Sequence, residues 1–120
     1  MSKAQDLRQR FKQMMAGDKL IVAPGVYDGL TATLSTRTGF DAIYMTGAGT
    51  AAQKGYPDYG LLTMTEMVAN AETIATATDI PVVADADTGY GNELNVTRTV
   101  QEFERAGVAA IHLEDQGFPK

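Results

Sequence analysis

The sequence predicts an α/β fold in which parallel strands alternate with helices. Four short apolar runs read as buried strands: 20–23, 41–46, a run that begins at Pro81, and 108–114. Helical patterns with capping residues and closing glycines separate these runs, and strands that alternate with helices pair in parallel through crossover connections. Each run also ends in polar or glycine-rich residues, as expected where a parallel sheet carries a functional site.

The composition is that of one small domain. The 120 residues are 44% hydrophobic and 21% charged, which is ordinary for a globular chain. A formal net charge of −5 and the lack of a basic run make nucleic acid and anionic membranes poor partners. The chain has no cysteine, so no disulfide or thiolate chemistry is expected within it. A charged N-terminus and the lack of long apolar runs predict a cytoplasmic protein without a membrane span.

Helix signals occupy the start of the chain and the segment after the first strand. Ser2 caps an expected N-terminal helix within residues 1–17, which Gly17 ends. Asp28 caps a second helix that reaches about Thr38 before Gly39. The apolar face of the first helix would consist of Leu7, Phe11, Met14 and Met15.

Two more helices flank the run at Pro81. Thr63 and Glu66 form a capping box for a helix that runs to about Thr78, and a later helix begins at Asn92 or Asn95. A long, glycine-rich loop is expected between the second strand and this capping box. The packing faces would be Met67, Ala71 and Ile74 in the first of these helices, and Val96, Val100 and Phe103 in the second.

Two carboxylates, two residues apart, follow the third strand. Val83, Asp85 and Asp87 would lie on one side, because side chains alternate along a strand. Like charges at this spacing repel each other unless a cation lies between them. Carboxylate oxygens suit Mg²⁺, so this pair predicts a metal or substrate site. The alternative is that Asp87 only caps the turn that follows.

Further carboxylates are expected to join this pair. Glu114 ends the fourth strand, and Asp58 lies in the long loop after the second. Because the carboxyl ends of parallel strands share one edge, Asp58, Asp85, Asp87 and Glu114 would converge there. Four oxygen donors predict a hard-metal site in which some ligands act through water.

Two nearby motifs allow other interpretations. Residues 85–89 begin like a calcium loop, but its fifth position is Gly89 and its twelfth is Val96. The turn at 47–49 resembles a dinucleotide-binding turn, although Gly55 and Pro57 argue against the helix that such a site requires. Its backbone N–H groups would instead approach an anionic ligand, or the turn has no ligand.

Two ring side chains have alternative roles. His112 is the only histidine, and we expect it to be a hydrogen-bonded interior residue rather than a catalytic one. Tyr44 shares a strand face with Thr46, and it is either a core residue or a proton-transfer group near a metal.

Five motifs, in order along nearly the whole chain, resemble the isocitrate lyase/phosphoenolpyruvate mutase superfamily. They are APGVYD at 23–28, YMTGAG at 44–49, PDYGLLT at 57–63, DADTGYG at 85–91, and HLEDQ at 112–116 continuing to Lys120. Within the superfamily, the chain is most similar to the 2-methylisocitrate lyase and 2,3-dimethylmalate lyase branch.

The resemblance implies a (β/α)₈ barrel, of which this chain supplies the N-terminal helix at 1–17 and the first four strands. Residues 1–120 would form the N-terminal half of that single domain. Asp85 would bind Mg²⁺, or Mn²⁺ in its place. Asp58, Asp87 and Glu114 would hold the water molecules of the ion or complete its coordination shell. The substrate-binding residues would be Tyr44, Thr46, Gly47, Ala48 and Asp85, and the catalytic residues Tyr44 and Lys120.

The implied activity is Mg²⁺-dependent carbon–carbon cleavage of a substituted 2-hydroxy di- or tricarboxylate, which yields an α-keto acid and a second carboxylate. Within the superfamily, the alternatives are a phosphoenolpyruvate mutase, a phosphonopyruvate hydrolase and an oxaloacetate-processing enzyme. Outside it, the alternative is a non-catalytic ligand-binding module. Lys120 matches the lysine that precedes a Cys-Gly-His run in the lyase branch. A half-barrel exposes two strand edges, so activity is expected of the complete barrel, which the resemblance implies to be a homotetramer.

Overall fold

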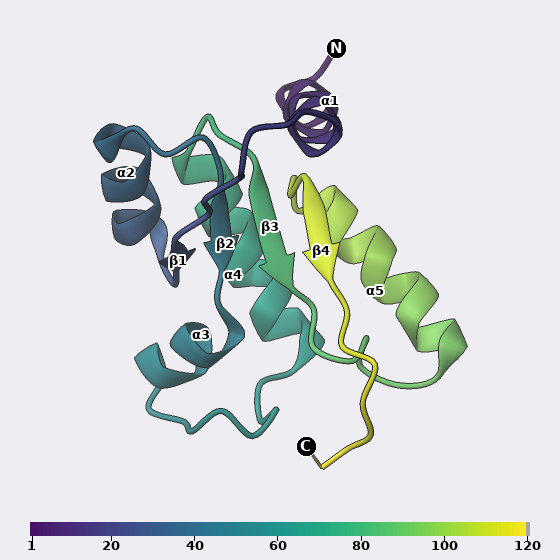
Figure 1. Ribbon diagram of the computed structural model, residues 1–120. Coiled ribbons are helices and arrows are strands. Elements are labelled where there is room, and N and C mark those ends of the chain that lie inside the picture. The colour runs from purple at the N-terminus through teal and green to yellow at the C-terminus, as the bar shows by residue number, and fades with distance from the viewer. Residues whose placement is uncertain (120) are drawn as a thin grey trace.

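The computed structural model describes residues 1–119. Its strands form one four-stranded parallel sheet, and helices α2, α4 and α5 cover one face of that sheet (Figure 1). The elements are α1 (Lys3–Ala16), β1 (Gly25–Val26), α2 (Gly29–Thr38), β2 (Ile43–Met45), α3 (Gly47–Gln53), α4 (Met64–Ala77), β3 (Val82–Asp85), α5 (Glu93–Arg105) and β4 (Ala110–His112). The predicted α/β class is therefore confirmed.

The strands lie side by side in chain order, β1-β2-β3-β4. The register places Tyr44 beside Gly25 on one side and beside Val83 on the other, and Asp85 beside His112. Parallel pairing requires a crossover between consecutive strands, and the helices supply it. All four strands thus end at the same edge.

The first strand was predicted too early in the chain. Residues 20–23 lie outside the sheet, and Leu20 is 82% exposed. The register explains the shift: Gly25 pairs with Tyr44, so residues 20–23 lie opposite the turn before β2 and have no strand beside them. An apolar run without a partner strand cannot satisfy its backbone groups in a ladder.

The predicted helix starts are confirmed where a capping side chain was identified. Asp28 accepts a hydrogen bond from the Thr31 N–H at 2.7 Å, and Gly39 ends α2 in the left-handed conformation. At α4, the Thr63 backbone N–H and its hydroxyl both donate to Glu66. These donors hold the pKa of the Glu66 carboxyl below its ordinary value.

Helix α3 replaces the first part of the predicted long loop. Thr46 caps it by accepting a hydrogen bond from the Gly49 N–H at 3.1 Å. The helix ends at Gln53, before Gly55 and Pro57. These helix-breaking residues limit the length of α3 but do not prevent its start.

The core lies between the sheet and the helices behind it. The predicted face of α4 is confirmed, since Met67, Ala71 and Ile74 are buried. In α5, Phe103 is buried as predicted, but Val100 is 41% exposed and Thr99 is buried instead. Val100 lies on the side of α5 next to the unpaired edge of β4, where the described residues place no further helix.

Helix α1 crosses the end of the structure opposite the strand C-termini (Figure 1). Its cationic side chains bind carbonyls at the C-terminal ends of other helices: Lys3 donates to the Ala75 carbonyl, and Arg8 donates to the Glu104 carbonyl. Helix C-termini carry unsatisfied carbonyls and partial negative charge, which favour such contacts. Of the predicted apolar face only Leu7 is buried, and Met15 is exposed.

The longest helices of the described segment have 14 residues. None of the helices in residues 1–119 has both the length and the apolar character of a membrane span.

Replacing Phe103 by alanine should lower the free energy of unfolding by about 3–5 kcal/mol, because it removes a fully buried aromatic ring. Leu94→Ala, on the same helix but 75% exposed, should change it by less than about 0.5 kcal/mol. Urea unfolding followed by circular dichroism measures both values. Equal losses in the two variants would show that α5 does not pack as described.

Candidate functional site at the carboxyl ends of the strands

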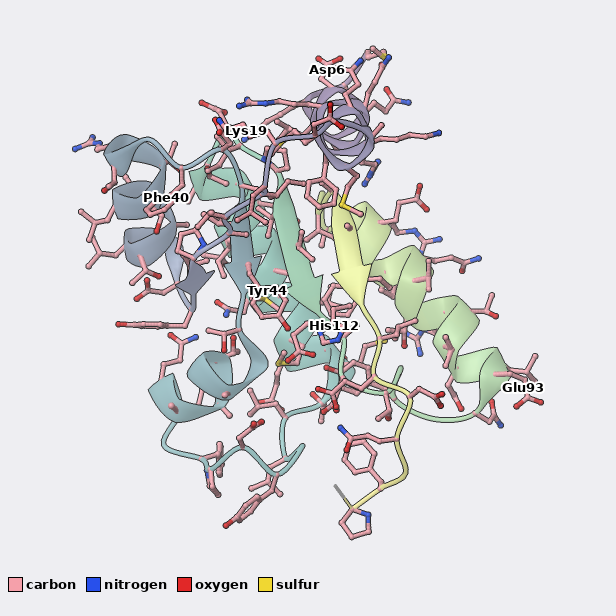
Figure 2. All side chains as sticks on the ribbon, in the orientation of Figure 1. Asp6, Lys19, Phe40, Tyr44, Glu93 and His112 are labelled. Carbon is pink, nitrogen blue, oxygen red and sulfur yellow. The ribbon has the colours of Figure 1, made fainter. Side chains whose placement is uncertain are left out.

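The predicted site residues gather at the edge where the strands end. This edge carries the start of α3, the loop after β3 and the segment after β4 (Figure 1). The helices cover the opposite face of the sheet, so side chains on the near face remain accessible. Figure 2 shows Tyr44 and His112 on that uncovered face.

The Asp85 carboxylate is held by two backbone N–H groups. Gly47 donates to Asp85 Oδ2 at 3.2 Å, and Asp87 donates to Asp85 Oδ1 at 2.8 Å. Hydrogen bonds to a carboxylate are stronger than those between neutral groups. They fix the orientation of Asp85 and join the end of β3 to the start of α3.

Asp87 reaches the site through a turn and not through strand periodicity. Strand β3 ends at Asp85, and Asp87 has a φ of 51°, in the left-handed region. The Gly89 N–H donates to the Ala86 carbonyl at 3.0 Å and closes this turn. The prediction that strand alternation places Asp87 beside Asp85 is therefore wrong in its reason, although Asp87, 8% exposed, does lie in the same region.

Three of the four predicted carboxylates share one small cavity. Asp58, Asp85 and Asp87 line a space of about 20 Å³ together with Tyr90, enough for about one water molecule. Glu114 instead lines an adjoining open cleft of about 820 Å³, which Tyr90 also borders. The Glu114 N–H still ties this segment to the site by donating to the Asp87 carbonyl at 2.7 Å.

These carboxylates are not arranged as a direct metal cage. Within residues 1–119, no group of three or more His, Cys, Asp or Glu side chains is close enough to hold a metal ion. The donor chemistry nevertheless suits Mg²⁺, because Asp58, Asp85 and Asp87 are among the residues that line the cavity, and carboxylate oxygens are ligands that this ion prefers.

Tyr44 and His112 meet across the uncovered face of the sheet. The Tyr44 hydroxyl lies 3.1 Å from His112 Nδ1, and the ring centroids are 6.2 Å apart (Figure 2). His112 is hydrogen-bonded as expected, but in residues 1–119 it is exposed and not interior, because it ends β4 on the face that the helices leave open. Sequence reasoning gave no partner for His112, since the contact joins residues 68 positions apart.

Two polar groups of the predicted substrate-binding turn form hydrogen bonds with other groups of the protein. The Thr46 hydroxyl caps α3, and the Gly47 N–H is bound to Asp85. A Cβ at position 47 would lie 2.2 Å from Asp85 Oδ2, so only glycine allows this close approach. Ala48 follows in the first turn of α3, near the same edge.

Comparison with known proteins assigns the chain to a family. The family model described as phosphoenolpyruvate phosphomutase matches residues 11–120. The chain belongs to this family. The resemblance inferred from the five motifs is thereby confirmed, and so is the fold class, as the N-terminal helix and first four strands of a (β/α)₈ barrel.

Individual relatives agree with this assignment. The chain is 56% identical over 112 residues to 2,3-dimethylmalate lyase of Eubacterium barkeri, covering 92% of this chain and 39% of the relative. It is 40% identical over 119 residues to 2-methylisocitrate lyase of Bacillus subtilis, covering 99% and 40%. A crystal structure of 2,3-dimethylmalate lyase, titled a PEP mutase/isocitrate lyase superfamily member, matches with a TM-score of 0.86 and 50% identity, covering 100% and 40%. The chain thus spans about two-fifths of these relatives.

Tyr90 belongs to the site but was not predicted. Its hydroxyl is buried and has no hydrogen-bond partner among the described residues. Burial raises the pKa of Tyr90, and the charges of Asp87, Asp85 and Glu114 raise it further, so the phenol stays protonated. Its place within the motif at 85–91 was the only signal in the sequence. Lys120, predicted to be catalytic, lies outside the described residues.

Replacing Gly47 by alanine should lower the free energy of unfolding by about 1–3 kcal/mol, because the new methyl group displaces the Asp85 carboxylate. Gly29→Ala is the matched control: Gly29 also begins a helix, but a Cβ there would make ordinary contacts at 3.7 Å or more. Urea denaturation of both variants gives the comparison. If Gly47→Ala were as stable as Gly29→Ala, the close approach of residue 47 to Asp85 would be refuted.

Proposed function

We propose that the protein carrying this chain is a Mg²⁺-dependent carbon–carbon lyase. Its substrate would be a substituted 2-hydroxy di- or tricarboxylate of the 2,3-dimethylmalate or 2-methylisocitrate type. The observation that carries the proposal is the fixed Asp85 carboxylate beside the Tyr44–His112 pair, in a chain 56% identical to a 2,3-dimethylmalate lyase. Lyases are prominent among the relatives.

Each residue of the site has a role in this proposal. Asp85 would hold the cation, while Asp58, Asp87 and Glu114 would bind its water molecules. The bound ion would polarise the substrate carboxylate and hydroxyl and act as a template for cleavage. Mn²⁺, which takes the same oxygen ligands, is the alternative ion.

Tyr44 is the proposed base. Its hydroxyl lies on the uncovered face, where a substrate has access, and His112 Nδ1 fixes its direction at 3.1 Å. Tyr44 would pass its phenol proton to His112 Nδ1 and take the proton of the substrate hydroxyl, as the carbon–carbon bond breaks and an α-keto acid forms. The cleaved fragment leaves as a carbanion stabilised by its own carboxylate, and it must then be protonated.

Phosphoryl-mutase chemistry is the second candidate, because the matching family model is described as phosphoenolpyruvate phosphomutase. The same carboxylates would serve either reaction. The two reactions use different substrates. Keto-acid release from hydroxy-diacids should therefore be compared directly with turnover of phosphoenolpyruvate. The homotetramer, the catalytic role of Lys120 and the cytoplasmic location stay predictions.

Asp85→Ala should lower kcat/KM for 2,3-dimethylmalate or 2-methylisocitrate about 10²–10³-fold in the presence of Mg²⁺, because it removes the charge that the two backbone N–H groups orient. Keto-acid release in a coupled assay measures this. Asp79→Ala removes a carboxylate whose side chain is 92% exposed, and it should keep the wild-type rate. Full activity in Asp85→Ala would exclude the proposed cation site.

Tyr44→Phe should lower kcat by about 10²–10⁴-fold and leave KM nearly unchanged, because the ring still packs while the proton acceptor is lost. Steady-state kinetics on the same substrate separate the two constants. An unchanged kcat would remove Tyr44 as the base, and a rise in KM alone would make it a binding residue.

A further inference from the structure

The loop after β3 holds Tyr90 in an unfavourable backbone conformation. Tyr90 has a φ of 64°, and Asp87 has one of 51°. Residues other than glycine are uncommon in this region, and the strain persists only where surrounding structure imposes it. Here the neighbouring glycines impose it: Gly89 and Gly91 have φ of 97° and 141° and pack against α5 without room for a side chain.

Helix α5 anchors this loop from behind. The buried Thr99 hydroxyl donates to the Gly89 carbonyl at 2.8 Å. A Cβ on Gly89 would lie 2.4 Å from a Val96 methyl group, and one on Gly91 would lie 2.2 Å from Asn95 Oδ1. The loop is therefore fixed, and with it the place of the Tyr90 ring.

Core packing alone does not account for a tyrosine at this position. The ring packs against the hydrophobic core, which phenylalanine would do equally well. The hydroxyl is buried without a partner among the described residues, and an unsatisfied buried polar group is unfavourable. The Tyr90 side chain lines both the water-sized cavity and the open cleft, and Asp85, Asp87 and Glu114 lie near it.

We infer that Tyr90 is a positioning residue for the proposed cation site, whose phenol oxygen accepts a hydrogen bond from a water molecule of the hydrated divalent ion. Water bound to a divalent ion is a strong hydrogen-bond donor, because the ion polarises it. The carboxylates around the cavity accept from other waters, whereas Tyr90 offers a neutral acceptor on the side of the glycine loop. The inference rests on the proposed function, since it presumes an ion at Asp85 and Asp87.

Tyr90→Phe tests this inference with a change of one oxygen atom. Mg²⁺ binding is measured by isothermal titration calorimetry on the full chain of wild type, Tyr90→Phe and Tyr56→Phe. Tyr56 is exposed and lines neither cavity, so its variant controls for the loss of a phenol hydroxyl. We expect Mg²⁺ to bind about five- to thirtyfold more weakly to Tyr90→Phe, and equally well to Tyr56→Phe.

Urea unfolding without Mg²⁺ separates this role from a structural one. Removing an unsatisfied buried hydroxyl should leave the metal-free stability equal to that of wild type, or raise it. Equal Mg²⁺ affinity in Tyr90→Phe and wild type would overturn the inference and leave the proposed function intact. A variant that is already less stable without Mg²⁺ would also overturn it. Wild type that binds no Mg²⁺ would overturn both proposals.

Discussion

The hydrogen bonds to Asp85 are the constraint on which the rest of the site depends. They join the end of β3 to the first residue of α3 and to the loop that follows β3. They also offset the repulsion that acidic neighbours exert on a carboxylate at this position. With them, Asp85 has one orientation before any ligand binds, and that preorganisation is what electrostatic catalysis requires.

The glycines of this region serve that constraint. Gly47 lets the start of α3 approach the Asp85 carboxylate, and Gly89 and Gly91 let α5 pack closely against the loop that carries Tyr90. The loop turns in the left-handed region at Asp87 as well. Strain at a functional loop is tolerated because buried contacts behind it, such as the Thr99 hydrogen bond, hold it in place.

The two faces of the sheet have different roles. Helices bury the outer face, and the core residues Ile43, Met45 and Val82 lie there. The other face is open, and it presents Tyr44 and His112 at the strand ends. In a complete barrel this face is the interior, so side chains that are exposed here would line the centre of the active site.

The sequence by itself determined the α/β alternation, the helix caps at Ser2, Asp28 and Thr63, and the family, because these depend on residues close together in the chain. It also marked Asp85 as a site residue. Only the tertiary structure decided that residues 20–23 lie outside the sheet, that α3 forms, and that Asp87 arrives through a turn. It likewise decided that His112 meets Tyr44 and that the Tyr90 hydroxyl is buried beside the carboxylates. The reason is physical: register, partner strands and long-range contacts arise between segments that the chain brings together only when it folds.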